Sequence, residues 1–279
     1  MAQSTPAIER SLAGLLNLDE YPIHEPDHPA RARLVARARA DLASHQCCSI
    51  PNLLNPEAQA EMVREALSLQ SAANHNNSLR NCYLHRQIDP ELPPDHPRNL
   101  QDRSSVRMVA YDQIAGDSLL KAFYHSDAVR TLVADIVQEG ELFDNEDPYQ
   151  PANYVCYQDG DESSWHFDSD NSFTMTLMIQ AAQEGGDFQM SPNAREDDDE
   201  NYDHVRELLN GNRDDTIRTI SREPGALCIF RGCNSLHRVT PVSGDVLRIM
   251  GVFVYEFSPG QLGDPEVNAT IYGPRVVAA

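Results

Sequence analysis

Three side chains near the middle of the chain have the types and spacing of a metal-binding site. His166 and Asp168 stand two residues apart in the run WHFD, and His237 follows in SLHRVTP. Residues two apart in a strand point to the same face of a sheet, so the first two side chains can reach one ion. Two imidazoles and one carboxylate on one face of an octahedron leave three positions open, which suits Fe(II) that must bind a bidentate cosubstrate and O2. We therefore predict His166, Asp168 and His237 as metal ligands and catalytic residues.

A second His-x-Asp run competes with this interpretation. It comprises His125, Ser126 and Asp127, but the sequence SDAVRTLVADIV reads as a helix that Ser126 or Asp127 would cap. His204 competes with His237 as the distal ligand, yet its surroundings, YDHVRELL, are helical. We assign the second run to helix capping and His204 to a solvated helix face.

Arg248, in GDVLRIMG, is the fourth member of the predicted site. A 2-oxoglutarate that chelates iron through its keto acid end leaves a distal carboxylate to be held, and a guanidinium can hold it with two parallel hydrogen bonds. The 11 residues from His237 to Arg248 allow a strand, a turn and a return strand. The apolar neighbours of Arg248 argue against a surface ion pair, so we predict that it binds the cosubstrate.

The elements that must position these residues fall into two parts. Residues 28–45 and 55–72 carry apolar side chains at helical spacing, and residues 76–107 read as an irregular, lid-like loop before a helix at 126–137. After residue 150, turn signals separate short runs rich in β-branched and aromatic residues, as in an antiparallel barrel or jelly roll. These runs are ANYVCYQ, SFTMTLMIQA, GDFQM, ALCIF and VLRIMGVFVYEF.

We therefore predict a mainly β fold with flanking helices, of the α+β class. One domain would span 1–279, with helical support over about 1–75, the loop or lid over 76–107, and a jelly-roll core over about 150–257. One helix, EDDDENYDHVRELLNG, interrupts the strands. Its acidic start suits the positive end of a helix dipole, and Asn-Gly ends it.

Composition limits the partners. The chain has 22 basic and 43 acidic residues, and its formal net charge of −21 repels phosphate backbones and anionic lipid. We expect a small-molecule substrate, no nucleic-acid partner and no membrane partner. Composition does not decide whether the chain forms a homodimer. No run approaches the ~20 apolar residues of a membrane span, and the first residues lack a signal-peptide pattern, so we expect a cytoplasmic location. The six cysteines include no CxxC pair and are expected to be reduced thiols.

Over roughly residues 150–257, the order of these motifs resembles the Fe(II)- and 2-oxoglutarate-dependent oxygenase superfamily, in which HxD, a distal His and a following Arg lie on a double-stranded β-helix. The resemblance implies a cupin-like jelly-roll core that uses Fe(II), 2-oxoglutarate and O2. Tyr157, nine residues before His166, matches a strand tyrosine that often contacts the cosubstrate in such enzymes. An aromatic residue in the barrel core is the open alternative for Tyr157.

Longer phrases resemble one subfamily, which contains radical halogenases and hydroxylases of free aliphatic amino acids. They are WHFDSDNSFTMTLMIQAAQEGGDFQM, DDENYDHVRELL and FRGCNSLHRVTPVSGDVLR. The resemblance implies a free amino acid or a similar small polar substrate. In halogenases of this kind a small residue replaces the metal carboxylate, whereas Asp168 is present here, so hydroxylation with release of succinate and CO2 is predicted. The following SDNS, 169–172, differs from the relatives in length and acidity, so no lysine-type specificity is carried over.

Arg80, Tyr83 and His85, in SLRNCYLHR, are candidates for substrate binding, with Arg80 facing a carboxylate. Exposed loop residues without a ligand are the alternative. Desaturation, ring closure and halogenation could use the same site and stay open. A peptide or protein hydroxylase and a non-catalytic, cupin-like binding protein are the alternatives from other classes.

Overall fold

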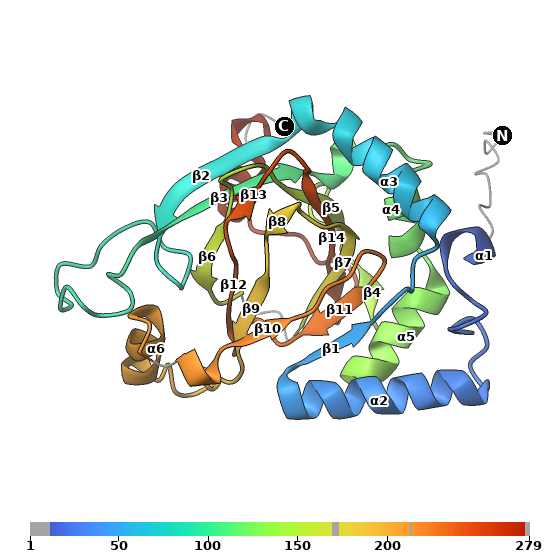
Figure 1. Ribbon diagram of the computed structural model, residues 1–279, viewed down its shortest axis with the longest axis horizontal. Helices are drawn as coiled ribbons and strands as arrows, with labels where there is room; N and C mark the ends of the chain where they lie inside the picture. Colours follow the sequence, from blue (N-terminus) through green and yellow to red (C-terminus); the bar gives the residue numbers. More distant parts are fainter. Residues whose placement is uncertain (1–11, 169–172, 213, 277–279) are drawn as a thin grey trace.

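Two antiparallel β-sheets face each other around the centre of the molecule (Figure 1). The computed structural model describes residues 12–168, 173–212 and 214–276. The larger sheet has the strand order β1 (Cys47–Ile50), β11 (Leu227–Phe230), β7 (Thr174–Gln180), β14 (Arg248–Phe253), β5 (Ala152–Tyr157), β3 (Asp102–Val109) and β2 (Asn74–Arg80). The smaller sheet has the order β10 (Arg218–Ile220), β9 (Phe188–Ser191), β12 (Leu236–Val239) and β6 (Ser163–His166). Short pairs join β13 (Val242–Ser243) to β8 (Glu184–Gly185) and β15 (Tyr255–Glu256) to β4 (Phe143–Asp144). The predicted mainly β jelly roll with flanking helices is confirmed.

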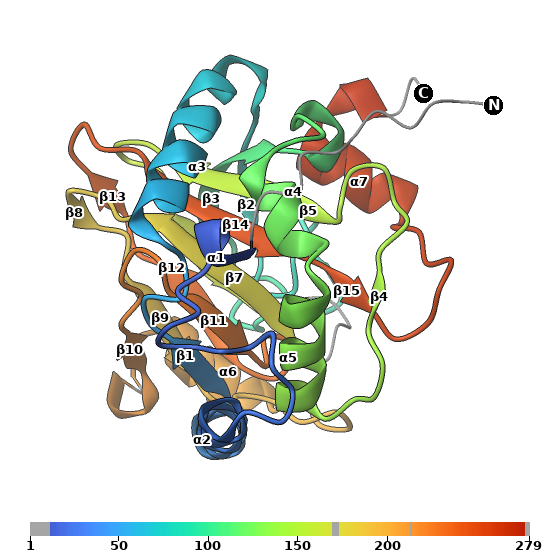
Figure 2. The ribbon, with the colours of Figure 1, turned by 90° about the vertical axis from the view of Figure 1, so that its right-hand side faces the viewer.

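Helices cover the outer face of the larger sheet (Figure 2). They are α1 (Leu12–Leu15), α2 (Pro29–His45), α3 (Pro56–Ser68), α4 (Leu119–Tyr124) and α5 (Asp127–Val137). Two further helices, α6 (Tyr202–Leu209) and α7 (Pro265–Tyr272), lie elsewhere, α7 against β2 and β3. Short 3-10 turns cover Gln70–Ala72, Tyr111–Gln113, Asp214–Thr216 and Pro274–Val276. Within these described ranges, no helix has the length and apolar character to cross a membrane.

Strand β5 shows why the core strands read as continuous apolar runs. All of its residues are buried, because both faces of the larger sheet are covered. Tyr154 and Cys156 pack toward the helices, whereas Val155 and Tyr157 point into the space between the sheets. The alternation of side chains along a strand thus places Tyr157 inside the jelly roll.

The prediction that residues 76–107 form one irregular loop is wrong at both ends. Strands β2 and β3 pair as a hairpin, from Asn74 opposite Met108 to Arg80 opposite Asp102, so the irregular part covers only 81–101. The β2 sequence NHNNSLR is polar with alternating exposure, and backbone hydrogen bonds hold it at the sheet edge. An edge strand of this kind has no apolar run to reveal it.

Two predictions about helix starts have different outcomes. The capping role of the second His-x-Asp run is confirmed, because the Ser126 hydroxyl accepts from the Val129 N–H at 3.4 Å and α5 begins at Asp127. His125 Nδ1 pairs with Asp144 at 2.8 Å, away from the metal triad. The acidic residues 196–200 lie outside α6, which begins after Asn201 in the left-handed conformation, so their predicted place in a helical first turn is wrong.

Candidate metal centre and cosubstrate pocket

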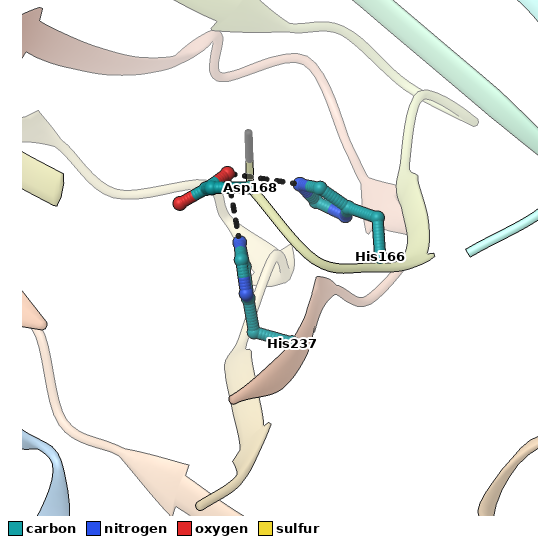
Figure 3. Close-up of side chains that lie close together, drawn as sticks. All are labelled: His166, Asp168 and His237. Atoms are coloured by element: carbon teal, nitrogen blue, oxygen red, sulfur yellow. Dashed lines mark ion pairs between the residues drawn. The ribbon is translucent and has the colours of Figure 1, made fainter. Parts of the chain in front are cut away.

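Three side chains converge on one point between the sheets (Figure 3). His166 ends β6, His237 lies opposite it on β12, and Asp168 follows β6 by two residues. Asp168 Oδ1 lies 3.8 Å from His166 Nε2 and 3.4 Å from His237 Nε2. Among the described residues, these three form the group that could surround one ion, and His204 does not belong to it.

The spacing of this group fits an octahedral Fe(II). Ligand atoms about 2.1 Å from one ion and on one octahedral face lie about 3 Å apart. The separations of 3.4 and 3.8 Å therefore need only a small inward shift. The opposite face of the octahedron stays open for a bidentate cosubstrate and O2.

Both imidazoles are held with Nε2 directed at the shared point. His166 Nδ1 lies 2.7 Å from the Ser164 carbonyl oxygen, and His237 Nδ1 lies 2.9 Å from that of Ser235. Since a carbonyl oxygen only accepts, each Nδ1 carries the proton, which leaves the Nε2 lone pair free for a metal. Burial, with the charges of His237 and Arg80, lowers the pKa of His166 to about 3. The His166 ring is therefore neutral near pH 7.

The Asp168 residue is fixed by the start of β7 and by the turn that follows β11. The Thr174 hydroxyl, at the start of β7, donates to Asp168 Oδ2, and the Asp168 N–H donates to the Gly232 carbonyl at 3.0 Å. A Cβ on Gly232 would lie 2.7 Å from Asp168 Cγ, so this close approach requires glycine. Burial raises the pKa of Asp168, but its interactions with His237 and His166 and the hydrogen bond from Thr174 outweigh burial and hold it below its usual range. The carboxylate is thus ionised and ready for a cation.

Arg248 and Tyr157 lie side by side within the jelly roll. They are paired on β14 and β5, and the guanidinium carbon lies 5.1 Å from the centre of the tyrosine ring. Arg248 is 1% exposed, and its Nε donates to the Gly186 carbonyl at 2.9 Å. Its Nη2 has no partner in the part of the chain that the structure describes. Burial lowers the pKa of Arg248 to about 10, and an unsatisfied buried N–H is costly, so the site calls for an anionic ligand.

The surroundings of Arg248 fit the distal carboxylate of 2-oxoglutarate. A Cβ on Gly186 would lie 2.7 Å from Arg248 Cδ. Because Gly186 has no side chain, the Arg248 side chain has the space that it occupies. Thr176 Oγ1, on β7, is also buried without a partner among the described residues. A carboxylate could satisfy both the free Arg248 N–H and a hydroxyl of this kind.

The structure separates the three predicted substrate residues. Arg80, at the end of β2, lies near the metal triad. Its Nη2 donates to Ser163 Oγ at 3.3 Å. Burial lowers the pKa of Arg80, and the nearby Tyr157 and Asp168 offset part of that effect. Tyr83 stacks on Phe167 with ring centroids 5.6 Å apart. His85 is exposed in the turn that follows. Geometry therefore favours Arg80, leaves Tyr83 as a neighbour and gives His85 no place at the centre.

The 81–101 segment is attached to the chain between two of the triad residues. The Phe167 N–H donates to the Cys82 carbonyl at 2.8 Å, between His166 and Asp168 in the sequence. Tyr202, in α6, contacts Tyr83 with ring centroids 6.1 Å apart. This segment thus lies beside the triad, as a substrate-covering loop would.

A family model described as HalD, Halogenase D, matches residues 30–262. The chain belongs to this family. Several solved structures share its fold: AviO1 from Streptomyces viridochromogenes has a TM-score of 0.54 at 14% identity, covering 82% of this chain and 97% of that one. The non-heme alpha ketoglutarate dependent epimerase SnoN from nogalamycin biosynthesis has 0.53 at 13% identity, covering 84% and 91%. A 2OG-Fe(II) oxygenase family oxidoreductase from Burkholderia pseudomallei has 0.50 at 15% identity, covering 81% and 92%.

No curated protein matches the chain significantly in sequence. The family, the shared fold and the His-Asp-His group nevertheless agree with the resemblance to the Fe(II)- and 2-oxoglutarate-dependent oxygenases. Motif spacing identified the triad but missed Thr174, Gly232 and Gly186. The glycines act through the space that they leave, and no local pattern marks such a role.

Proposed function

We propose that the protein hydroxylates an unactivated C–H bond of a small polar substrate, a free amino acid or a derivative, with release of succinate and CO2. The observation that carries the proposal is the Asp168 carboxylate, which is fixed beside two metal-ready imidazoles in a chain of the Halogenase D family. A third protein ligand occupies the position that a halide would need. Oxygen transfer is therefore favoured over chlorination.

In this proposal the residues divide the work of binding and orientation. His166, Asp168 and His237 hold Fe(II), which when bound supplies the redox activation of O2 coupled to decarboxylation of the cosubstrate. The buried guanidinium of Arg248 would hold the distal carboxylate of 2-oxoglutarate. Tyr157 packs against that guanidinium and limits how it can turn.

Arg80 is the residue that we assign to the substrate. Its Nε is buried without a partner in the described residues, and its position between Ser163 and the triad suits the carboxylate of an amino acid. Burial lowers the pKa of Arg80, and an incoming carboxylate would reverse part of that effect. The 81–101 segment, held at Phe167, would cover such a small molecule.

The test is a panel of free amino acids incubated with the Fe(II)-loaded protein, ascorbate, chloride and 2-oxoglutarate. Succinate formation and a mass gain of one oxygen on one amino acid are expected. Arg80→Met is expected to raise KM for that amino acid, while Arg86→Met, an exposed arginine of the same segment, leaves it unchanged. A mass gain that matches chlorine would overturn the hydroxylase assignment, and turnover of peptides alone would overturn the small-molecule substrate.

A further inference from the structure

A second arginine near Arg248 has no place in the site described so far. Arg222 lies in the turn between β10 and β11. Its guanidinium carbon lies 3.4 Å from the centre of the Phe188 ring and 5.2 Å from that of Phe230. The side chain thus points inward from a surface turn, and it covers aromatic rings that belong to the space between the sheets.

These aromatic rings connect Arg222 to the metal triad. The rings of Phe188 and Phe230 lie 5.6 and 5.0 Å from the ring of His237. Arg222 is therefore separated from a predicted iron ligand by one layer of side chains. Its charge also contributes to the lowered pKa of Arg248 and offsets part of the raised pKa of Tyr157. The two guanidinium groups therefore lie within electrostatic range of each other.

The hydrogen-bonding state of Arg222 sets it apart from a surface arginine. Its Nε and Nη2 are both buried and lack a partner within the described ranges, as does Nη2 of Arg248. Three guanidinium nitrogens with unused N–H groups therefore gather in one region. Burying two like charges near each other is unfavourable, and it is more so when some of their N–H groups are unsatisfied.

A hydroxyl in the same region lacks a partner too. Thr176 on β7 is the cross-strand partner of Cys228 on β11, and Arg222 acts on the Cys228 thiol. Cross-strand partners point to the same face of a sheet, so Thr176 Oγ1 lies on the side of the sheet that Arg222 approaches. Two cations and a hydroxyl are a donor set suited to a carboxylate.

We propose that Arg222 is a second binding residue for the distal carboxylate of 2-oxoglutarate, which it holds together with Arg248. The inference rests on the proposed use of this cosubstrate. It assigns to Arg222 a contact with the ligand instead of a purely structural stacking role on Phe188. The charge of the ligand then offsets the mutual repulsion of the two arginines.

The experiment compares two ligands that share the keto acid and differ in the distal carboxylate. Anaerobic Fe(II)-loaded protein is titrated calorimetrically with 2-oxoglutarate and with 2-oxopentanoate, for wild type, Arg222→Met, Arg222→Gln and Arg248→Met. Charge-assisted hydrogen bonds of this kind correspond to about a 10- to 100-fold change in Kd. We expect both Arg222 variants to weaken 2-oxoglutarate binding by that factor and to leave 2-oxopentanoate binding within about twofold.

Arg218→Met, on the exposed strand β10 that precedes the turn carrying Arg222, is the matched control and is expected to bind both ligands as wild type does. An equal loss of affinity for both ligands in the Arg222 variants would show a structural role and overturn the inference, as would unchanged binding of 2-oxoglutarate. If Arg248→Met loses discrimination while the Arg222 variants keep it, the inference fails and the proposed function stands. If wild type binds Fe(II) but not 2-oxoglutarate, both fail.

Discussion

Replacing Gly232 by alanine tests whether the position of the Asp168 carboxylate controls iron binding. The new Cβ would lie 2.7 Å from Asp168 Cγ and 3.0 Å from Thr174 Oγ1. The new Cβ would also overlap Asp168 Oδ2, its nearest neighbour. Ordinary carbon contacts are about 3.5 Å, so the carboxylate must move by at least about 0.8 Å. Metal sites tolerate about 0.2 Å in ligand distance. Since φ of Gly232 lies outside the left-handed region, alanine adds no backbone strain there.

We expect Gly232→Ala to weaken Fe(II) binding by about 10- to 100-fold, the range for lost support of a metal ligand. The affinity is measured anaerobically by competition with a chromophoric chelator, and thermal unfolding of the metal-free protein checks the fold. Gly116→Ala is the control, because a Cβ at Gly116 meets nothing within 4 Å. If Gly232→Ala bound Fe(II) as tightly as Gly116→Ala does, the carboxylate would not be placed by this contact.

Three further predictions concern the same centre. Asp168→Ala should lower succinate formation at least about 10-fold, and full 2-oxoglutarate decarboxylation by this variant would refute its role as a ligand. The pKa of His166 is lowered from 6.5 to about 3, so at pH 5 the unfolded chain binds a proton at this residue that the folded chain does not. The free energy of unfolding of the metal-free protein should therefore fall by about 2 kcal/mol from this group between neutral pH and pH 5. Urea unfolding of wild type and His166→Gln measures this loss, and an identical pH slope in both would contradict it. Gly186→Ala, with φ of +68° and a Cβ 2.7 Å from Arg248 Cδ, should weaken 2-oxoglutarate binding and spare Fe(II) binding, as parallel titrations would show.

The sequence was sufficient to predict which three side chains come together, because two of them share one short motif and the third lies in a clear strand context. His166 and Asp168 are two residues apart, and His237 lies in a run whose strand neighbours are visible as apolar segments. The pairing of Arg248 with Tyr157 needed more, namely that β14 and β5 are neighbours in a particular register. The resemblance implied a cosubstrate contact for Tyr157, but neither it nor strand spacing gave the order and register of the strands that pair the two residues.

The contacts that tune the centre could not be predicted in this way. Thr174 and Gly232 contact Asp168 only after β7 and the turn following β11 have come together. Neither residue type by itself indicates that it positions a carboxylate. The hairpin of β2 and β3 was missed for a related reason, because its polar edge strand is held by backbone hydrogen bonds that any sequence can make. Both failures concern contacts that depend on how strands and turns pair in the folded chain, which the local residue pattern does not give.

The choice between oxygen and halogen transfer depends on how firmly the Asp168 position is built for a carboxylate. The Thr174 hydroxyl donates to one carboxylate oxygen, the two imidazoles approach the other, and Gly232 leaves space for the group as a whole. If a small residue stood at 168, the same hydroxyl and the same space would face an open metal position, and an anion could use both. The carboxylate therefore occupies what would otherwise be an anion site, and this is the physical argument for the hydroxylation that we propose for a chain of the Halogenase D family.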